Sequence, residues 1–539
     1  MMNPRFDMTR RAALRTSAAI AASVVAPWSA FAAETPRKGG VFTVHYGAEQ
    51  RQLNPSLQAS TGVYIIGGKI QESLLDLDAH GKTVGVLAES WESTPDGKTV
   101  TFHLRKGVNW HDGKPFTSAD VAFTAMKMWK PILNYSSTLQ QFLTGVDTPD
   151  AHTAVFHYDR PMPLGLLLRA LPDLGYVSAK HIYEQGDIRT NPANFAPVGT
   201  GPFKFVEYQR GQYIIAERNP NYWRGGGMPY LDRIVWRVVT DRSAAAARME
   251  AGEILYSPFS GLTLSDTARL AKDKRFVVTT KGNEGNARTN TLEFNFRRKE
   301  LADIRVRQAI AHAINVPFFI DNFLGAFAKA GTGPIPSVST DFYPTDQGPQ
   351  YPYDKARAIQ LLDAAGFKAG AGGTRFTLKL FPAPWGEDIS LFSTFIQQSL
   401  GDVGIKVDIV RTDGGGYLKQ VYADHVFDLA TGWHQYRNDP AVSTTVWYRS
   451  GQPAGAPWTN QWGWTDPVID RIIDNAATEL DPAKRKALYG DFERRANTEL
   501  PLWHPIEQIF QTVITAKARN ASNNPRWGSS TWHDLWLEA

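Results

Sequence analysis

The chain has 539 residues, with 58 lysines and arginines against 53 aspartates and glutamates, and it contains no cysteine. Without cysteine it cannot form disulfides, thiolate metal sites, iron–sulfur clusters, a thiol nucleophile or a cysteine-linked lipid anchor. Hydrophobic residues make up 42% and charged residues 21%, as in ordinary globular proteins. Because one hydrophobic core rarely grows beyond about 300 residues, we expect two or more lobes.

The first 32 residues have the features of an export signal. Residues 9–14 (TRRAAL) place paired arginines before an apolar run at 18–25, and residues 30–32 (AFA) match a cleavage site. The arginine pair favours twin-arginine export, with general secretion as the alternative because Ala13 stands where that signal usually has an aromatic residue. The run is shorter than the roughly 20 residues of a membrane span. We therefore expect a soluble periplasmic protein with no lipid anchor and no stable membrane insertion.

The charge of the chain argues against a nucleic-acid partner. The formal net charge is +5, and the first 32 residues hold four arginines against Asp7, a net +3 that leaves +2 for the remainder. No run of lysines and arginines follows that could track a phosphate backbone.

Strand-like and helix-like stretches alternate along the chain, which predicts an α/β fold. Strands are predicted at residues 41–46, 99–104, 234–239, 377–380, 405–410 and 427–430. Helices are predicted at residues 118–129, 305–314, 354–365, 391–400 and 482–499.

Motifs for metal, cofactor or catalytic chemistry are missing from the sequence. His111 and Asp112 lie in a Trp-His-Asp-Gly turn, where a structural role is favoured. Residues 199–201 and 331–333 both read GTG, but a proline follows each, and proline lacks the N–H that a phosphate cradle needs. No GxSxG or HExxH motif occurs. We expect no metal, no cofactor and no enzymatic activity.

Three short blocks carry a family resemblance. Residues 87–91 (LAESW), 96–99 (DGKT) and 110–113 (WHDG) resemble the signature of the peptide/nickel-type solute-binding proteins of ABC importers, family 5 of the extracellular solute-binding proteins. Further blocks follow in the family's order at residues 199–203, 218–223, 229–234, 292–295, 306–310, 313–315 and 353–366. The resemblance covers almost the whole chain after the leader.

The resemblance implies a type II periplasmic-binding fold, with two lobes, a hinge of two linking strands and an extra domain inserted in the first lobe. Lobe one is expected at 36–77, 197–297 and 505–539, the inserted domain at 78–196, and lobe two at 298–504. The implied function is a monomeric receptor that captures one small solute between its lobes and delivers it to an inner-membrane ABC permease. Three alternatives stay open: a secreted carboxylate-based hydrolase, an exported redox enzyme, which the missing motifs disfavour, and a nickel-chelate receptor of the same family.

The segment at 431–440 (TGWHQYRNDP) is the strongest candidate for a solute site. It follows the strand predicted at 427–430, and ligands in α/β sheets collect beyond the carboxyl ends of strands. In peptide-binding relatives an aspartate three residues before the Asp-Pro pair binds the ligand ammonium, but here that position is Tyr436. The loop at 381–386 lacks the arginine that dipeptide binders use for the ligand carboxylate. Both departures argue against a plain dipeptide.

Flat aromatic rings beside directional polar groups suit a sugar-like ligand or a carboxylate-bearing conjugate such as an opine. Arg437 is expected to bind a carboxylate or a hydroxyl-rich rim, with little effect on stability when removed. The predicted ligand-binding residues are Tyr46, Trp385, Trp433, His434, Tyr436, Arg437, Trp458 and Asn460.

Overall fold

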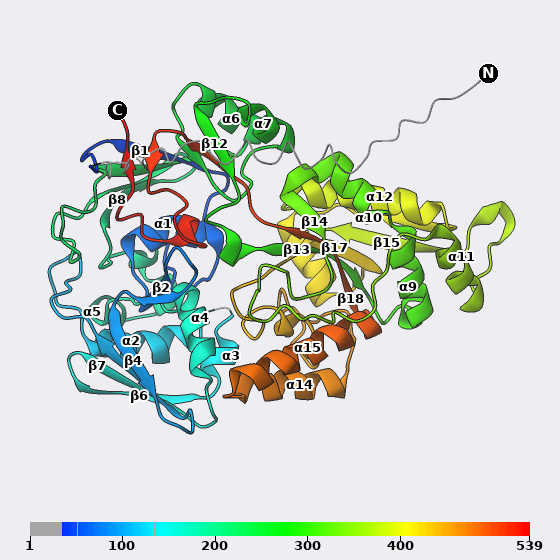
Figure 1. Ribbon diagram of the computed structural model, residues 1–539, viewed down its shortest axis with the longest axis horizontal. Helices are drawn as coiled ribbons and strands as arrows, with labels where there is room; N and C mark the ends of the chain where they lie inside the picture. The colour runs from blue at the N-terminus through cyan, green and yellow to red at the C-terminus, as the bar shows by residue number, and fades with distance from the viewer. Residues whose placement is uncertain (1–34, 51, 134) are drawn as a thin grey trace, which may run out of the picture. The chain divides into compact units, whose positions relative to one another are not determined.

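Three β-sheets organise the chain, in a computed structural model that describes residues 35–50, 52–133 and 135–539. Residues 38–539 form a single unit by their internal contacts. Figure 1 shows the first large sheet around β1, the second around β17, and the smaller inserted sheet around β4. The leader predicted at 1–32 lies outside the described residues.

The first lobe is built on a seven-stranded sheet in the order β12-β19-β11-β1-β10-β9-β8. Its central strands β1 and β10 are parallel and pair over six residues. The strands are β1 (Val41–Tyr46), β8 (Phe203–Gln209), β9 (Tyr213–Arg218), β10 (Arg233–Val238), β11 (Tyr256–Ser257), β12 (Phe276–Thr279) and β19 (Thr512–Thr515). Its helices are α1 (Thr61–Ile70), α6 (Arg242–Glu250) and α7 (Leu264–Leu270).

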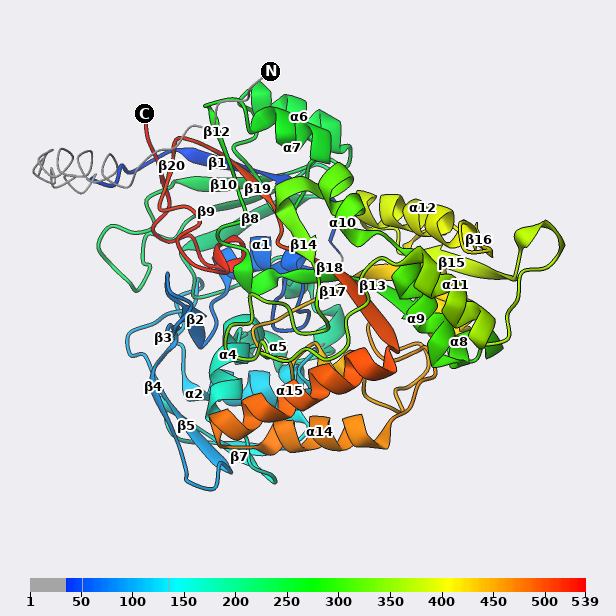
Figure 2. The same cartoon turned by 45° about the vertical axis from the view of Figure 1, so that its right-hand side comes forward.

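The second lobe is built on a six-stranded sheet in the order β14-β18-β13-β17-β15-β16. The strands are β13 (Arg288–Phe294), β14 (Ala328–Ala330), β15 (Phe376–Pro382), β16 (Ile405–Ile409), β17 (Leu429–Gln435) and β18 (Leu502–Gln508). The helices are α8 (Lys299–Ala302), α9 (Ile304–Ala313), α10 (Val316–Phe319), α11 (Lys355–Ala364), α12 (Glu387–Gly401), α13 (Gly414–Tyr417), α14 (Pro467–Thr478) and α15 (Pro482–Glu499). Figures 1 and 2 both show α12 on the side of this sheet away from α14 and α15.

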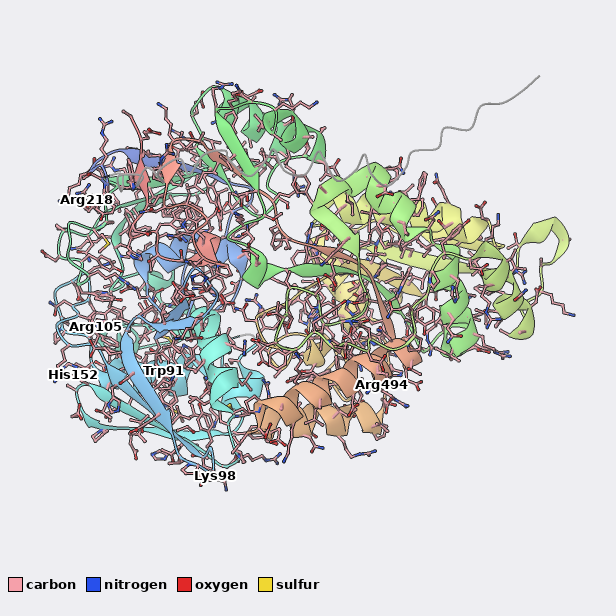
Figure 3. The ribbon with its side chains drawn as sticks, in the orientation of Figure 1. Trp91, Lys98, Arg105, His152, Arg218 and Arg494 are labelled. Carbon is pink, nitrogen blue, oxygen red and sulfur yellow. The ribbon has the colours of Figure 1, made fainter. Side chains whose placement is uncertain are left out.

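The inserted domain is centred on a four-stranded antiparallel sheet in the order β4-β5-β7-β6. Figure 3 marks Trp91 and Arg105 on this domain, Arg218 on the first lobe and Arg494 on α15. The strands are β2 (Leu75–Leu77), β3 (Thr83–Gly85), β4 (Ala88–Ser93), β5 (Thr99–Leu104), β6 (Leu143–Asp150) and β7 (Thr153–Tyr158). The helices are α2 (Ser118–Thr124), α3 (Ser137–Gln140), α4 (Leu164–Leu174) and α5 (Lys180–Tyr183), and the C-terminal hairpin is β20 (Ala518–Arg519) with β21 (Trp536–Leu537).

Within the described residues, the chain passes between the two large sheets twice. Residues 280–287 lead from β12 to β13, and residues 509–511 lead from β18 to β19. β13 begins and β18 ends at one paired position, Arg288 opposite Gln508. The two connections therefore leave the second sheet side by side, which is the arrangement of a hinge.

The expected lobe limits differ from the strand pairing at three places. β2 (Leu75–Leu77) was expected in lobe one, but it pairs with β3 of the inserted domain. Lobe one was expected to reach residue 297, but β13 at 288–294 pairs with β17 over seven residues and so belongs to the second sheet. β18 runs to Gln508, so it crosses the expected boundary between 504 and 505. Strand pairing, which short sequence blocks do not show, decides all three points.

Two predicted elements also need correction. The loop expected from residue 431 is strand as far as Gln435, because β17 pairs with β13 along its whole length. The helix expected at 118–129 is α-helical only to Thr124 and continues as a π-helical turn to Trp129.

No single described helix is long and apolar enough to cross a bilayer. By length and composition only the bent pair Ile304–Ala313 and Val316–Phe327, with an angle of 42° between its helices, could do so among the described residues. Helix α9 packs into the core of the second lobe through Val306, Ala309 and Ile310.

Candidate functional site

A cavity of about 360 Å³ is lined by residues of both lobes. The first lobe contributes the end of β1, the start of α1 and the segment at 258–261. The second lobe contributes the first residue of β13, the middle of β17 and the start of α12, and Phe510 from the hinge lies beside them. Its volume is at the lower end of the range for small-molecule sites, about 300–1,000 Å³.

The wall from the first lobe uses its polar atoms internally. His45 Nε2 donates to the carbonyl of Val239 at 2.9 Å, so its Nδ1 accepts from the Ser257 hydroxyl at 2.9 Å. Burial lowers the pKa of His45, which keeps the ring neutral. The Tyr46 hydroxyl donates to the carbonyl of Gly62 at 2.7 Å. Both rings therefore offer the cavity mainly apolar surface.

The wall from the second lobe contains a nearly buried ion pair. Arg288 Nη2 lies 3.4 Å from Oδ2 of Asp388, and it donates to Gln508 Oε1 at 2.5 Å. Asp388 also accepts from Asn290 Nδ2 at 3.2 Å. Burial lowers the pKa of Arg288, while Asp388 opposes that effect. Arg288 Nε has no hydrogen-bond partner among the described residues.

Aromatic rings surround the Arg288 guanidinium. It lies 4.9 Å from the ring centre of Phe510 and 5.6 Å from that of Trp433. Trp433 meets Phe510 edge-on at 6.1 Å, and Phe510 meets Phe259 edge-on at 5.7 Å. These contacts hold the cation by cation–π attraction and give the cavity flat apolar faces.

Arg242 lines the same cavity from the first lobe, at the start of α6. It is half-buried and makes no ion pair or hydrogen bond with any residue that the structure describes. The positive charge of Arg242 helps to lower the pKa of His45 and the pKa of Arg288, so it acts on both groups. Two cations and one carboxylate thus face this space.

The structure brings three of the eight predicted ligand residues together. Tyr46, Trp385 and Trp433 all line the 360 Å³ cavity, the first from one lobe and the others from the second. Trp385 rests edge-on against Tyr417, with ring centres 5.2 Å apart. Trp433 Nε1 is buried and has no hydrogen-bond partner among the described residues.

Tyr436 lines a different cavity, of about 570 Å³, between the inserted domain and the second lobe. Its hydroxyl is 2.5 Å from Ser339 Oγ. Arg169 of α4 forms an ion pair with Asp341 beside it. Trp91, labelled in Figure 3, lines the same space from β4.

His434 and Arg437 are buried at 2% and 3% exposure. Arg437 Nη2 donates to the carbonyl of Ala59 at 3.1 Å, and the guanidinium lies 4.6 Å from the ring centre of Tyr135. Its Nε and Nη1 have no hydrogen-bond partner in the described part of the chain. His434 packs against Trp447 at 5.2 Å, and burial lowers its pKa to about 3.

Trp458 and Asn460 lie outside both cavities. Asn460 donates to the carbonyls of Trp464 at 2.9 Å and Tyr448 at 3.4 Å, which fixes the local loop. Trp458 is half-buried and packs against the apolar core. Both side chains therefore stabilise the local structure and line neither cavity.

Sequence reasoning missed Arg242, Arg288 and Asp388. They are 46 and 100 residues apart in sequence, and only strand pairing and the start of α12 bring them to one cavity. No spacing motif marks them.

Among the described residues, no group of three or more His, Asp or Glu side chains could hold a metal ion.

Comparison with known proteins decides the family. Residues 82–456 match the bacterial extracellular solute-binding proteins, family 5 Middle, which is more than half of the chain. The chain belongs to this family. Its members bind solutes, so the chain is a solute-binding protein and not an enzyme, which removes the hydrolase and redox alternatives.

A Brucella ovis protein named for ABC-transporter peptide binding is 32% identical over 91% of this chain and 90% of its own length. A periplasmic binding protein of Helicobacter pylori, solved with a bound peptide, is 26% identical and superimposes with a TM-score of 0.78 over 93% of this chain and 99% of its own. A Bacillus subtilis oligopeptide-binding protein, solved with a nonapeptide, has the same fold at 22% identity and a TM-score of 0.79, covering 94% and 100%. The family 5 solute receptor is therefore the substrate-binding component of an ABC importer and carries the predicted type II fold.

Proposed function

We propose that this receptor captures one small peptide-like or opine-like solute in the 360 Å³ cavity and presents it to an inner-membrane permease. The observation that carries the proposal is the composition of the cavity wall: both lobes contribute, and the two chain crossings lie beside it. A solute that contacts both lobes stabilises their approach, because a ligand favours the conformation that it binds more tightly.

A buried nitrogen on β17 supports the same location. Trp433 lines the cavity, and its Nε1 is buried without a hydrogen-bond partner among the described residues. An unmet buried donor costs about 1–3 kcal/mol, so such groups usually bind a ligand or water. We infer that Trp433 stacks on the solute and that its indole N–H donates a hydrogen bond to it.

The family places the protein outside the cytoplasm, as an extracellular or periplasmic binding protein. The absence of cysteine leaves no residue for lipidation, so we propose a soluble periplasmic monomer released from its leader near residue 32. Peptide-like ligands are favoured by the Brucella relative, and opine-like ligands by the same fold in an Agrobacterium protein solved with agropinic acid, at 23% identity and a TM-score of 0.74.

The proposal is tested by native mass spectrometry of protein purified from the periplasm, followed by thermal-shift measurement with peptides, opines and sugars. We expect one solute per chain and a raised melting temperature, since a ligand at 100-fold excess over its Kd adds about 2.7 kcal/mol to the free energy of unfolding. Protein that carries no solute and responds to none of these compounds would contradict the proposal.

A further inference from the structure

The two arginines of the cavity approach it from opposite lobes. Arg242 belongs to the start of α6 in the first lobe, and Arg288 is the first residue of β13 in the second. Both also line a small second cavity of about 30 Å³, next to Ser260 and Asp388. The four residues shared by the two cavities therefore surround one point at the boundary between the lobes.

The charges that line the 360 Å³ cavity do not cancel. Asp388 pairs with Arg288, but Arg242 has no anionic partner among the described residues. His45 stays neutral because burial lowers its pKa. The lining of the 360 Å³ cavity thus retains one uncompensated positive charge, and the exposed Glu387 lines only the smaller cavity. Arg288 also has a buried Nε without a hydrogen-bond partner among the described residues. A buried or half-buried cation lacking a counter-ion is costly, so the site suits an anion.

Resting on the proposed function, we propose that Arg242 and Arg288 bind a carboxylate of the solute between the two lobes. Arginine presents several N–H groups in a planar fork, which matches the two oxygens of a carboxylate. Trp433 and Phe510 flank Arg288 and exclude water from one side of it. The anionic anchor then lies outside the 431–440 segment, and Arg288 contacts Trp433 of that segment.

A carboxylate held by both Arg242 and Arg288 also links the choice of solute to the closure of the two lobes. Without an anion, two guanidinium groups repel each other across the gap, and the repulsion grows as the lobes approach. A carboxylate placed between them attracts both, so a neutral analogue of the same shape loses the contact with each lobe. The solute selected is therefore an acid, such as a peptide with a free carboxyl end or an opine.

The test compares acids with uncharged derivatives by titration calorimetry. The probes are dialanine with dialanine amide, and mannopinic acid with its dimethyl ester. We expect at least one acid to bind the wild type at least 10-fold more tightly than its derivative. Arg242→Gln should weaken that acid on the order of 10- to 100-fold, the range for a hydrogen bond to a charged group.

Two further variants complete the test: one removes the second arginine without leaving its buried partner unpaired, and the other changes an arginine outside the cavity. Arg288→Gln together with Asp388→Asn removes both members of the buried pair and should also weaken the acid. Arg237→Gln changes an exposed arginine on β10 that does not line the cavity, and it should leave binding unchanged.

The inference fails if the acid and its derivative bind equally, or if Arg242→Gln leaves acid binding intact. It also fails if neither acid binds while an uncharged peptide or sugar does, a result that leaves the proposed receptor function standing. If no compound binds and no solute is carried, both proposals fail.

Discussion

Arg288 Nη2 lies 3.4 Å from Oδ2 of Asp388, with the two side chains only 7% and 10% exposed. Arg288 stands opposite Gln508 in the sheet, where both connections to the first lobe leave it. The ion pair therefore joins the start of α12 to the hinge end of the sheet, and it faces the solute cavity.

Arg288→Gln alone should lower the free energy of unfolding by about 3 kcal/mol, because it leaves the Asp388 carboxylate without its partner in a nearly buried site. The amides of Asn290 and Gln508 still donate to Asp388, so we expect the low end of the range. Adding Asp388→Asn should recover much of the loss. Urea denaturation of the three proteins measures this, and equal stability of Arg288→Gln and wild type would rule the pair out as a stabilising contact.

Stability should depend on Glu293, a buried residue of β13. Burial raises its pKa to about 8, from an unfolded value near 4.5. The folded state then binds the proton more tightly, so this contribution is complete below pH 4.5 and is lost as the pH rises to 8. At about 1.4 kcal/mol per pH unit, the loss is on the order of 4 kcal/mol.

Glu293→Gln should abolish that part of the pH dependence and be more stable than wild type at pH 8, where burying the carboxylate is most costly. Denaturation curves at pH 5, 6.5 and 8 supply the comparison. Parallel pH profiles for the two proteins would show that Glu293 does not titrate in this window.

Trp433→Ala and Arg437→Ala should have different effects. Trp433 is half-buried and lines the cavity, so its loss should weaken solute binding with little change in melting temperature. Arg437 is 3% exposed and holds the carbonyl of Ala59 and the ring of Tyr135, so its loss should lower the melting temperature as well. The sequence alone predicted little change in stability for Arg437. Calorimetric titration with a thermal melt for each variant checks both points, and an unchanged melting temperature for Arg437→Ala would restore the earlier expectation.

The mature protein should begin at about Ala33 and be recovered in the osmotic-shock fluid, since residues 30–32 provide a cleavage site and no cysteine is available for a lipid. N-terminal sequencing and fractionation test this. Full-length chain in the membrane pellet would contradict it.

Local elements were predictable because local patterning determines them. The strands expected at 41–46 and 99–104 are β1 and β5 with the same limits, and the helix expected at 482–499 is α15. Alternation of polar and apolar residues fixed the strands, and Asp481 followed by Pro482 fixed the helix start.

The site was only partly predictable, for a physical reason. Trp433 and Trp385 could be chosen because aromatic residues followed predicted strands. Arg242 and Arg288 could not, because their proximity depends on the pairing of β13 with β17 and on how two lobes meet across the hinge. Arg437 is near the predicted place in sequence, yet its side chain is buried against Ala59 and Tyr135.

The central claim, that the lobes close on an acidic solute, is tested most directly by small-angle X-ray scattering during a calorimetrically monitored titration. The wild type is titrated with whichever of dialanine and mannopinic acid binds it. The account predicts that the radius of gyration falls in proportion to occupancy, and that Arg242→Gln at the same acid concentration shows a smaller fall. Scattering curves that superimpose at zero and full occupancy would contradict closure on the solute.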